Sequence, residues 1–205
     1  MHSFQRNYAR VGALLGWGAV LVQLYLFLDN RTTSVGETLI RFFSYFTILS
    51  NIAVSCCFSS YFIKGRWHRF FSSPQTLTAV TVYILVVGMV YNAVLRQLWQ
   101  PEGIQKMVDE ILHSVNPLLL LIFWILYVPK QLLQWKDALP AIVFPLVYTL
   151  FIALRGAVSG FYPYPFINVT QLGYPKVLMN GCLLMVVFLG LSLVLTAIAK
   201  LASRR

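Results

Sequence analysis

The chain has few charged residues, and acids are the scarcest of them. Only 11% of its 205 residues are charged, with 16 lysines and arginines against 6 aspartates and glutamates. Because soluble domains carry about a quarter of charged residues, this composition argues against a water-soluble globule. It also excludes a disordered chain, which needs low hydrophobicity, and a nucleic-acid-binding arm.

Cysteine and histidine are also rare, which limits the available chemistry. Cys56, Cys57 and Cys182 fall in apolar runs without CxxC spacing, so we expect small buried apolar side chains and no disulfide framework. His113 alone among the histidines falls in an apolar run, and a lone histidine is a poor site for zinc, iron or bis-histidine haem. Walker, GxGxxG, HExxH and GxSxG motifs are missing. We therefore expect no metal and no cofactor.

What the chain has in abundance is hydrophobic residues, 59% of the total. A helix needs about 20 mostly apolar residues to cross the hydrocarbon core, and backbone groups in lipid must pair within the helix. Polar or turn-rich connectors divide the chain into six such segments, predicted at 8–28, 39–63, 76–99, 109–128, 138–156 and 176–200. Six spans nearly exhaust the chain. Residues 1–205 are therefore predicted to form one all-α, polytopic integral membrane domain with six transmembrane helices.

Alternate connectors differ in charge, and this predicts the orientation. The N-terminus, the connectors 64–75 and 129–137 and the C-terminus are rich in bases, with Asp137 as their one acid. On the opposite side, bases and acids nearly balance. Since basic residues accumulate in cytoplasmic loops, both termini are predicted to be cytoplasmic. The net charge of +10 then reflects topology and requires no nucleic acid as partner.

Polar side chains inside the predicted spans carry the main functional signal, because they are costly in hydrocarbon. If each span is a continuous helix, the polar side chains of five of the helices fall in the outer half of the membrane. They predict a polar pocket capped by the loop 162–165. The residues are Arg41, Ser44, Thr47, Asn51, Asn92, Arg96, Asp109, His113, Asn116, Arg155, Lys176 and Asn180. Each also has a structural interpretation: hydroxyls that bond their own helix, amides that bridge helices, and arginines that reach headgroups.

A hydroxyl, an imidazole and several donors in one pocket are the parts of an acyl-transfer site. A hydroxyl nucleophile needs a neighbouring base, and His113 is the candidate. Asp109, one turn earlier, or Glu110 would orient the imidazole. Candidate donors to a developing oxyanion are Asn51, Asn92 and Arg96.

Short motifs spread over residues 40–181 add a resemblance. They are FSYFTILSN at 43–51, LHSVNP at 112–117, YVPK at 127–130, WKDAL at 135–139, Arg155-Gly156, GFYPYPF at 160–166, LGY at 172–174 and Asn180. Together they resemble a family of bacterial six-span membrane proteins of unassigned function. This resemblance favours a bacterial plasma membrane.

That family in turn resembles, more distantly, the androgen-induced and androgen-dependent TFPI-regulating proteins of animals. Those are multipass threonine hydrolases of fatty-acid esters of hydroxy fatty acids. Carried over by position, the resemblance implies Thr47 as the nucleophile and His113 as the general base. Ser44 and Ser50 are neighbouring hydroxyls that stay open as alternatives.

We therefore predict an intramembrane hydrolase or acyl-transfer enzyme that acts on a lipid (fatty-acid) ester, with the bilayer and an amphipathic, lipid-like substrate as partners. Arg41, Arg96 or Arg155 would hold a carboxylate or phosphate of the substrate. The remaining candidates for substrate binding are Ser44, Asn51, Asn92, Asn116 and Asn180.

Two other classes of function stay open. The first is a non-enzymatic transporter or a protein that binds a lipid or an anionic solute, in which His113 relays protons. The second is a structural or assembly partner, for which substitutions in the pocket would matter less than substitutions on the surface.

Overall fold

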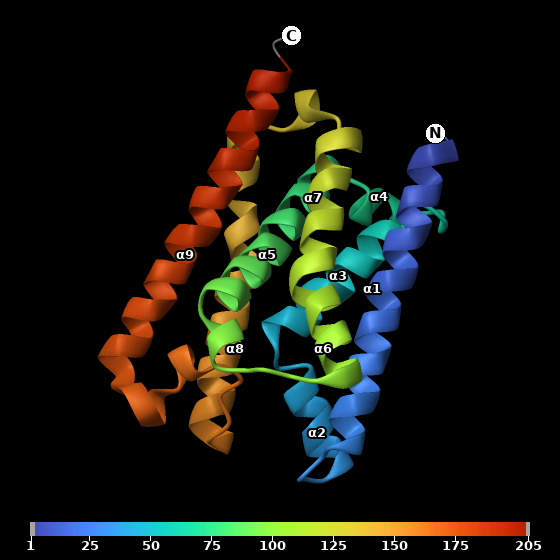
Figure 1. Cartoon of the computed structure of the whole chain (residues 1–205). Helices are drawn as coiled ribbons and strands as arrows, with labels where there is room; N and C mark the ends of the chain where they lie inside the picture. Colours follow the sequence, from blue (N-terminus) through green and yellow to red (C-terminus); the bar gives the residue numbers. More distant parts are fainter. Residues whose placement is uncertain (1–2, 204–205) are drawn as a thin grey trace.

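Helices form all the regular structure of residues 3–203, the part of the chain that this computed structural model describes (Figure 1). The α-helices are α1 (Ser3–Asp29), α2 (Val35–Phe42), α3 (Phe46–Ser59), α4 (Arg66–Phe71), α5 (Pro74–Ala93), α6 (Gly103–Glu110), α7 (Asn116–Tyr127), α8 (Val143–Ser159) and α9 (Val169–Ala202). A π-helix, Ile111–Val115, joins α6 to α7. Short 3-10 turns are Leu95–Gln97, Lys130–Leu132, Trp135–Ala138, Pro140–Ile142 and Pro165–Ile167. The prediction of an all-α chain is confirmed.

Several of these helices are long and apolar enough to cross a membrane. Within the described residues five segments qualify, and the bent pair α2–α3 would make a sixth. Helix α5 is the central one, because 61% of its most apolar 18-residue stretch is buried inside the bundle, against 22% of that of α1. The start of α1 and the end of α9 lie at one end of the bundle, whereas α2 lies at the opposite end (Figure 1).

The second predicted span, 39–63, is not one continuous helix. Helix α2 ends at Phe42, α3 begins at Phe46, and the two helices are bent by 70°. Between them Tyr45 has an extended backbone, with φ −82° and ψ 123°. The prediction of one continuous helix over 39–63, with Arg41 and Thr47 both on it, is therefore wrong. Arg41 belongs to α2, and Thr47 is the second residue of α3.

Two distant tyrosines stabilise this break. The Tyr148 hydroxyl donates to the Ser44 carbonyl over 2.8 Å, and the Thr47 N–H donates to the Tyr164 hydroxyl over 3.2 Å. Both backbone groups lie where the regular helix is interrupted. An unpaired backbone group costs several kcal/mol in an apolar surrounding, so these bonds make the break tolerable. No residue spacing within 39–63 predicts Tyr148 and Tyr164 as partners, because both lie far along the chain.

Other spans also start earlier than predicted, and the fourth and the last do so by the most. The fourth starts at Gly103 rather than 109, and its polar first turns are tied to α1 by a bond of 2.9 Å from Gln105 Nε2 to Gln23 Oε1. The last starts at Val169 rather than 176. It is kinked at Gly173, which has φ 75°, so the predicted segment corresponds to the part beyond the kink.

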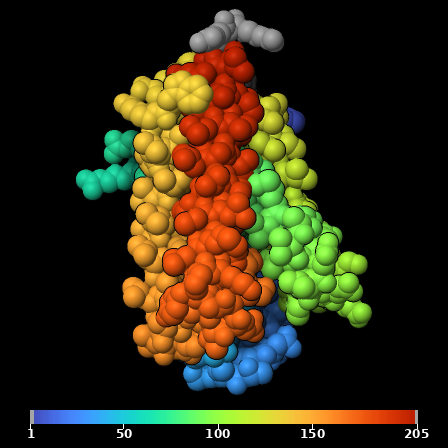
Figure 2. Space-filling view, turned by 90° about the vertical axis from the view of Figure 1, so that its left-hand side faces the viewer, coloured from blue at the N-terminus to red at the C-terminus, as the bar shows by residue number. Residues whose placement is uncertain are grey.

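The outer faces of the bundle are apolar. Leu14 on α1 and Leu154 on α8 are each 70% exposed, and Leu183 on α9 is 62% exposed. Figure 2 shows α9 running along the molecule beside α8. Apolar surface on this scale is rare on soluble monomers. Long apolar helices with such faces indicate an integral membrane protein. Cys182 is exposed on α9, so the expectation of burial is wrong for it, whereas Cys56 and Cys57 are buried.

Candidate functional site

A cavity of about 900 Å³ opens at the end of the bundle that carries α2. Its wall is formed by the end of α1, α2, the start of α3, the end of α5, the span from α6 to the π-helix, and the loop between α8 and α9. The predicted site residues in this wall are Arg41, Thr47, Asp109 and His113. Pro163, Tyr164 and Pro165 of the predicted capping loop line it as well.

Thr47 stands at the break between α2 and α3, where its backbone and side chain meet one tyrosine. The Tyr164 hydroxyl lies 3.2 Å from Thr47 N and 3.3 Å from Thr47 Oγ1. Burial raises the pKa of Tyr164 to about 12, so its hydroxyl keeps its proton at neutral pH. That hydroxyl accepts from the Thr47 N–H, and in its contact with Oγ1 either hydroxyl can be the donor. Tyr164 thus holds Thr47 at both its backbone and its side chain.

His113 is held in one tautomer by the residue one turn before it. Its Nδ1 lies 2.9 Å from the Asp109 carbonyl oxygen and 3.4 Å from Asp109 Oδ1. A carbonyl oxygen only accepts, so Nδ1 carries the proton and Nε2 of the neutral ring has a free lone pair. The ring also stacks on Tyr91, with centroids 3.9 Å apart and planes 17° apart. Of the two predicted orienting acids, Asp109 contacts His113, whereas Glu110 pairs with Arg96 over 2.7 Å.

The π-helix around His113 follows from the proline that comes four residues later. Pro117 has no N–H, and its ring crowds the carbonyl of residue 113, so the regular helical ladder is interrupted there. Helix α5 approaches this point closely: a Cβ on Gly88 would lie 2.9 Å from the His113 carbonyl oxygen. Asn92 Nδ2 lies 3.5 Å from the same oxygen. π-Helical turns occur often at functional sites, and this one presents the imidazole.

Two fully buried asparagines tie the π-helix to the helix that carries Thr47. Asn51 Nδ2 donates to the Leu112 carbonyl over 3.1 Å and to the Thr47 carbonyl over 2.9 Å. Asn116 Nδ2 donates to Asn51 Oδ1 over 2.7 Å. Asn51 and Asn116 are not in the cavity wall. Their amides hold the backbone on which the two candidate catalytic residues stand.

The other predicted polar residues also bond the protein itself. Asn92 donates to the Gly88 carbonyl over 2.8 Å, and Ser44 donates to the Ile40 carbonyl over 2.6 Å. Asn180 donates to the Phe166 carbonyl over 2.8 Å and so ties α9 to the loop above the cavity. None of these three is in the cavity wall.

An arginine cluster stands beside the cavity. Glu37 Oε1 accepts from Arg41 Nε over 2.7 Å and from Arg155 Nη2 over 3.0 Å. Both guanidinium groups lie 4.7 Å from the ring centre of Phe161. The Arg155 side chain is 9% exposed, and its Nη1 has no partner among the described residues. Arg41 and Phe161 are in the cavity wall, whereas Arg155 and Arg96 are not.

Sequence reasoning missed the roles of Tyr91, Tyr148 and Glu37. For Glu37, the spacing of four residues to Arg41 is a visible signal of a helical ion pair. For the tyrosines no pattern exists, because their partners are distant in the chain. No group of three His, Cys, Asp or Glu side chains in residues 3–203 is arranged to hold a metal ion.

Comparisons with models of protein families, with curated proteins and with solved structures give no match.

Proposed function

We propose that this protein is an intramembrane enzyme that hydrolyses a fatty-acid ester of a lipid, or transfers its acyl group, with Thr47 as nucleophile and His113 as general base. One observation carries the proposal. Thr47 and His113 come from separate spans and line one cavity, and Asp109 holds the imidazole in the tautomer that leaves Nε2 as the acceptor. The distant resemblance to animal threonine hydrolases, by way of a family of bacterial six-span membrane proteins, implies the same two residues.

The membrane topology is part of the proposal. The bent pair α2–α3 counts as one span, which gives six crossings and puts both chain ends on one side. The base-rich connectors belong to that side, so it is the cytoplasmic one. The cavity then opens in the outer half of a bacterial plasma membrane, where an ester of an amphipathic lipid reaches it from the bilayer.

The first half of the reaction transfers the acyl group to Thr47. Oγ1 attacks the ester carbonyl carbon while its proton passes to Nε2 of His113. When the tetrahedral intermediate collapses, the bond between that carbon and the alcohol oxygen breaks. The imidazolium returns the proton to the departing alkoxide. The products are a free alcohol and an acyl ester on Thr47.

The second half releases the fatty acid. His113 takes a proton from a water molecule as its oxygen attacks the acyl carbon. The bond to Thr47 Oγ1 breaks, and the threonine oxygen recovers the proton from the imidazolium. An alcohol in place of water gives acyl transfer by the same steps. Asp109 stabilises the imidazolium that forms in each half, since its carboxylate oxygen lies 3.4 Å from Nδ1.

Within residues 3–203 the Thr47 hydroxyl and the His113 ring share a cavity but form no direct hydrogen bond. Catalytic pairs in ligand-free enzymes are often long and close only around the substrate. When the pair closes around the substrate, the proton passes from Oγ1 to Nε2 directly, or through one bridging water.

The decisive experiment is ester turnover by the purified protein in lipid nanodiscs. We expect Thr47→Ala and His113→Ala each to lose at least about a hundredfold in rate, and Thr47→Ser to keep activity. Ser50→Ala is the matched control, because Ser50 is buried nearby but is not in the cavity wall. Wild-type rates in both alanine variants would exclude the catalytic assignment. No turnover by the wild type, combined with saturable binding of a fatty acid, would favour the non-enzymatic lipid-binding class.

A further inference from the structure

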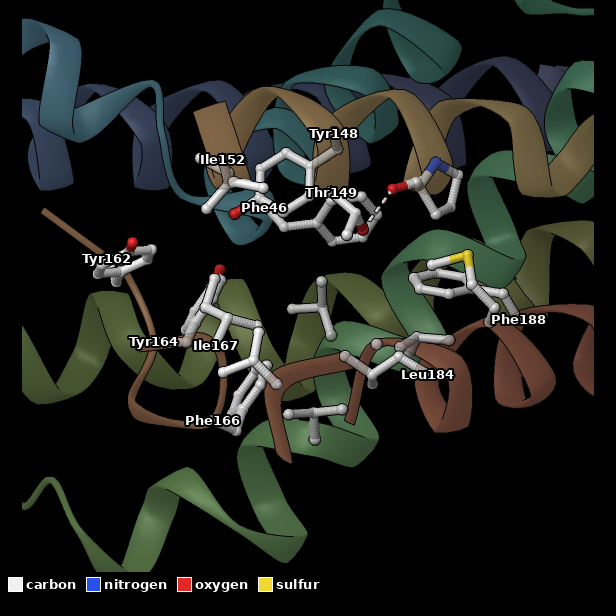
Figure 3. Close-up of a pocket in the computed structure, with 18 of the residues that line it drawn as sticks. Phe46, Tyr148, Thr149, Ile152, Tyr162, Tyr164, Phe166, Ile167, Leu184 and Phe188 are labelled. Carbon is white, nitrogen blue, oxygen red and sulfur yellow. Dashed lines mark hydrogen bonds between the residues drawn. The ribbon is translucent and has the colours of Figure 1, made fainter. Parts of the chain in front are cut away.

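A second, smaller cavity of about 110 Å³ lies next to Thr47 (Figure 3). It is enclosed by the start of α3, by α5, α8 and α9, and by the loop between α8 and α9. Aromatic and aliphatic side chains dominate its wall; those labelled in Figure 3 include Phe46, Ile152, Phe166, Ile167, Leu184 and Phe188. No charged side chain is in this wall.

The hydroxyls in this wall are mostly engaged with the protein. Tyr148 donates to the Ser44 carbonyl over 2.8 Å, and Thr149 donates to the Pro145 carbonyl over 2.8 Å. Tyr164 is bonded to Thr47. A ligand in this cavity would therefore meet apolar surface and few free polar groups. Such a lining suits a hydrocarbon chain and disfavours a polar solute.

Thr47 and Tyr164 are in the walls of both cavities. The candidate nucleophile thus stands at a boundary, with an apolar pocket on one side and a cavity lined by Arg41, Asp109 and His113 on the other. A fatty-acid ester has the same division at its carbonyl carbon, because one substituent is a hydrocarbon chain and the other is an alcohol group.

We infer that the small cavity is the acyl-chain pocket, that the large cavity takes the alcohol part of the ester, and that Gly181 sets the acyl chain length. This inference rests on the proposed function. Gly181 is in the wall of the small cavity, and a Cβ built on it meets no atom within 4 Å. The position therefore has room for a larger side chain, and the inference is that such a side chain takes space from the acyl chain.

The test compares Gly181→Leu with Gly190→Leu. Gly190 lies on the same helix, also has nothing within 4 Å of an added Cβ, and is in neither cavity wall. The readout is the ratio of kcat/KM for hexadecanoyl and butanoyl p-nitrophenyl esters. Each methylene buried in the pocket contributes roughly fourfold, so Gly181→Leu should lower the ratio at least about tenfold. The Gly190→Leu ratio should equal that of the wild type. An unchanged ratio in Gly181→Leu overturns the inference.

A second readout needs no catalysis. The Thr47→Ala protein is labelled by light with a hexadecanoic acid that carries a terminal diazirine, and the labelled peptides are identified by mass spectrometry. The inference predicts crosslinks to α8 and α9 around Ile152 and Leu184, competed by unlabelled hexadecanoate and weakened by Gly181→Leu. Crosslinks confined to other faces overturn it. Because photolabelling does not depend on turnover, it distinguishes failure of the pocket assignment from failure of the proposed hydrolase activity.

Discussion

Replacing Asn51 by leucine tests how the site is built. Asn51 is fully buried and makes three hydrogen bonds: to the carbonyls of Thr47 and Leu112 and from the amide of Asn116. Leucine has a similar volume and none of these bonds. The substitution therefore removes the polar link between α3 and the π-helix and leaves the Leu112 carbonyl without its partner.

The magnitude follows from those three bonds. Two of them, to Leu112 and from Asn116, join different helices, and such bonds contribute about 0.6 kcal/mol each on average in membrane proteins, which gives roughly 1 kcal/mol. Leaving a buried carbonyl and the Asn116 amide unpaired adds about 1–3 kcal/mol. We expect the free energy of unfolding to fall by about 2–4 kcal/mol. The rate should fall as well, by about a hundredfold if the imidazole moves by about 1 Å.

The assay is unfolding in mixed micelles by titration with sodium dodecyl sulfate, in a double-mutant cycle with Asn116→Leu. The double variant should lose about 1 kcal/mol less than the two single losses combined, because both remove the same bond between Asn116 and Asn51. Strict additivity, or an Asn51→Leu protein as stable and active as the wild type, would refute the role given to this pair.

Two further substitutions probe the supports of His113 and Thr47. Gly88→Ala places a Cβ 2.9 Å from the His113 carbonyl oxygen, so it should shift the π-helix and lower turnover at least about tenfold. The control is Gly18→Ala, whose added Cβ has no atom within 4 Å and should leave turnover unchanged. Tyr164→Phe removes the hydroxyl that bonds Thr47 N and Oγ1. Turnover should fall at least about tenfold, and the free energy of unfolding should fall by about 1 kcal/mol. The control is Tyr174→Phe, at an exposed position. For each substitution, turnover equal to that of its control would contradict the support that the substitution tests.

Much of the fold could be predicted from the sequence, because hydropathy alone locates apolar segments of membrane-spanning length. The break at 43–45 could not, since its freed backbone groups are satisfied by Tyr148 and Tyr164 from distant segments. The apolar run 39–63 by itself predicts a continuous helix. The break nonetheless determines the site, because it places Thr47 in the first turn of α3.

The candidate site could be predicted only in part. Polar residues in apolar spans point to one end of the bundle, but polarity does not tell a cavity wall from a structural bond. Thr47 and His113 are in the wall, whereas Asn51 and Asn116 bond backbone and one another. An asparagine amide is long enough to reach a neighbouring helix, and which carbonyl it meets depends on helix rotation, which one sequence does not reveal.

The most direct test of the central claim is the site of covalent labelling by a hydroxyl-reactive fluorophosphonate probe, mapped by mass spectrometry on the intact protein in nanodiscs. We predict a single phosphonylated residue, Thr47, with labelling lost in Thr47→Ala and slowed at least about a hundredfold in His113→Ala. Labelling at Ser44 or Ser50, labelling that persists in Thr47→Ala, or none in a protein that turns over esters would contradict the assignment.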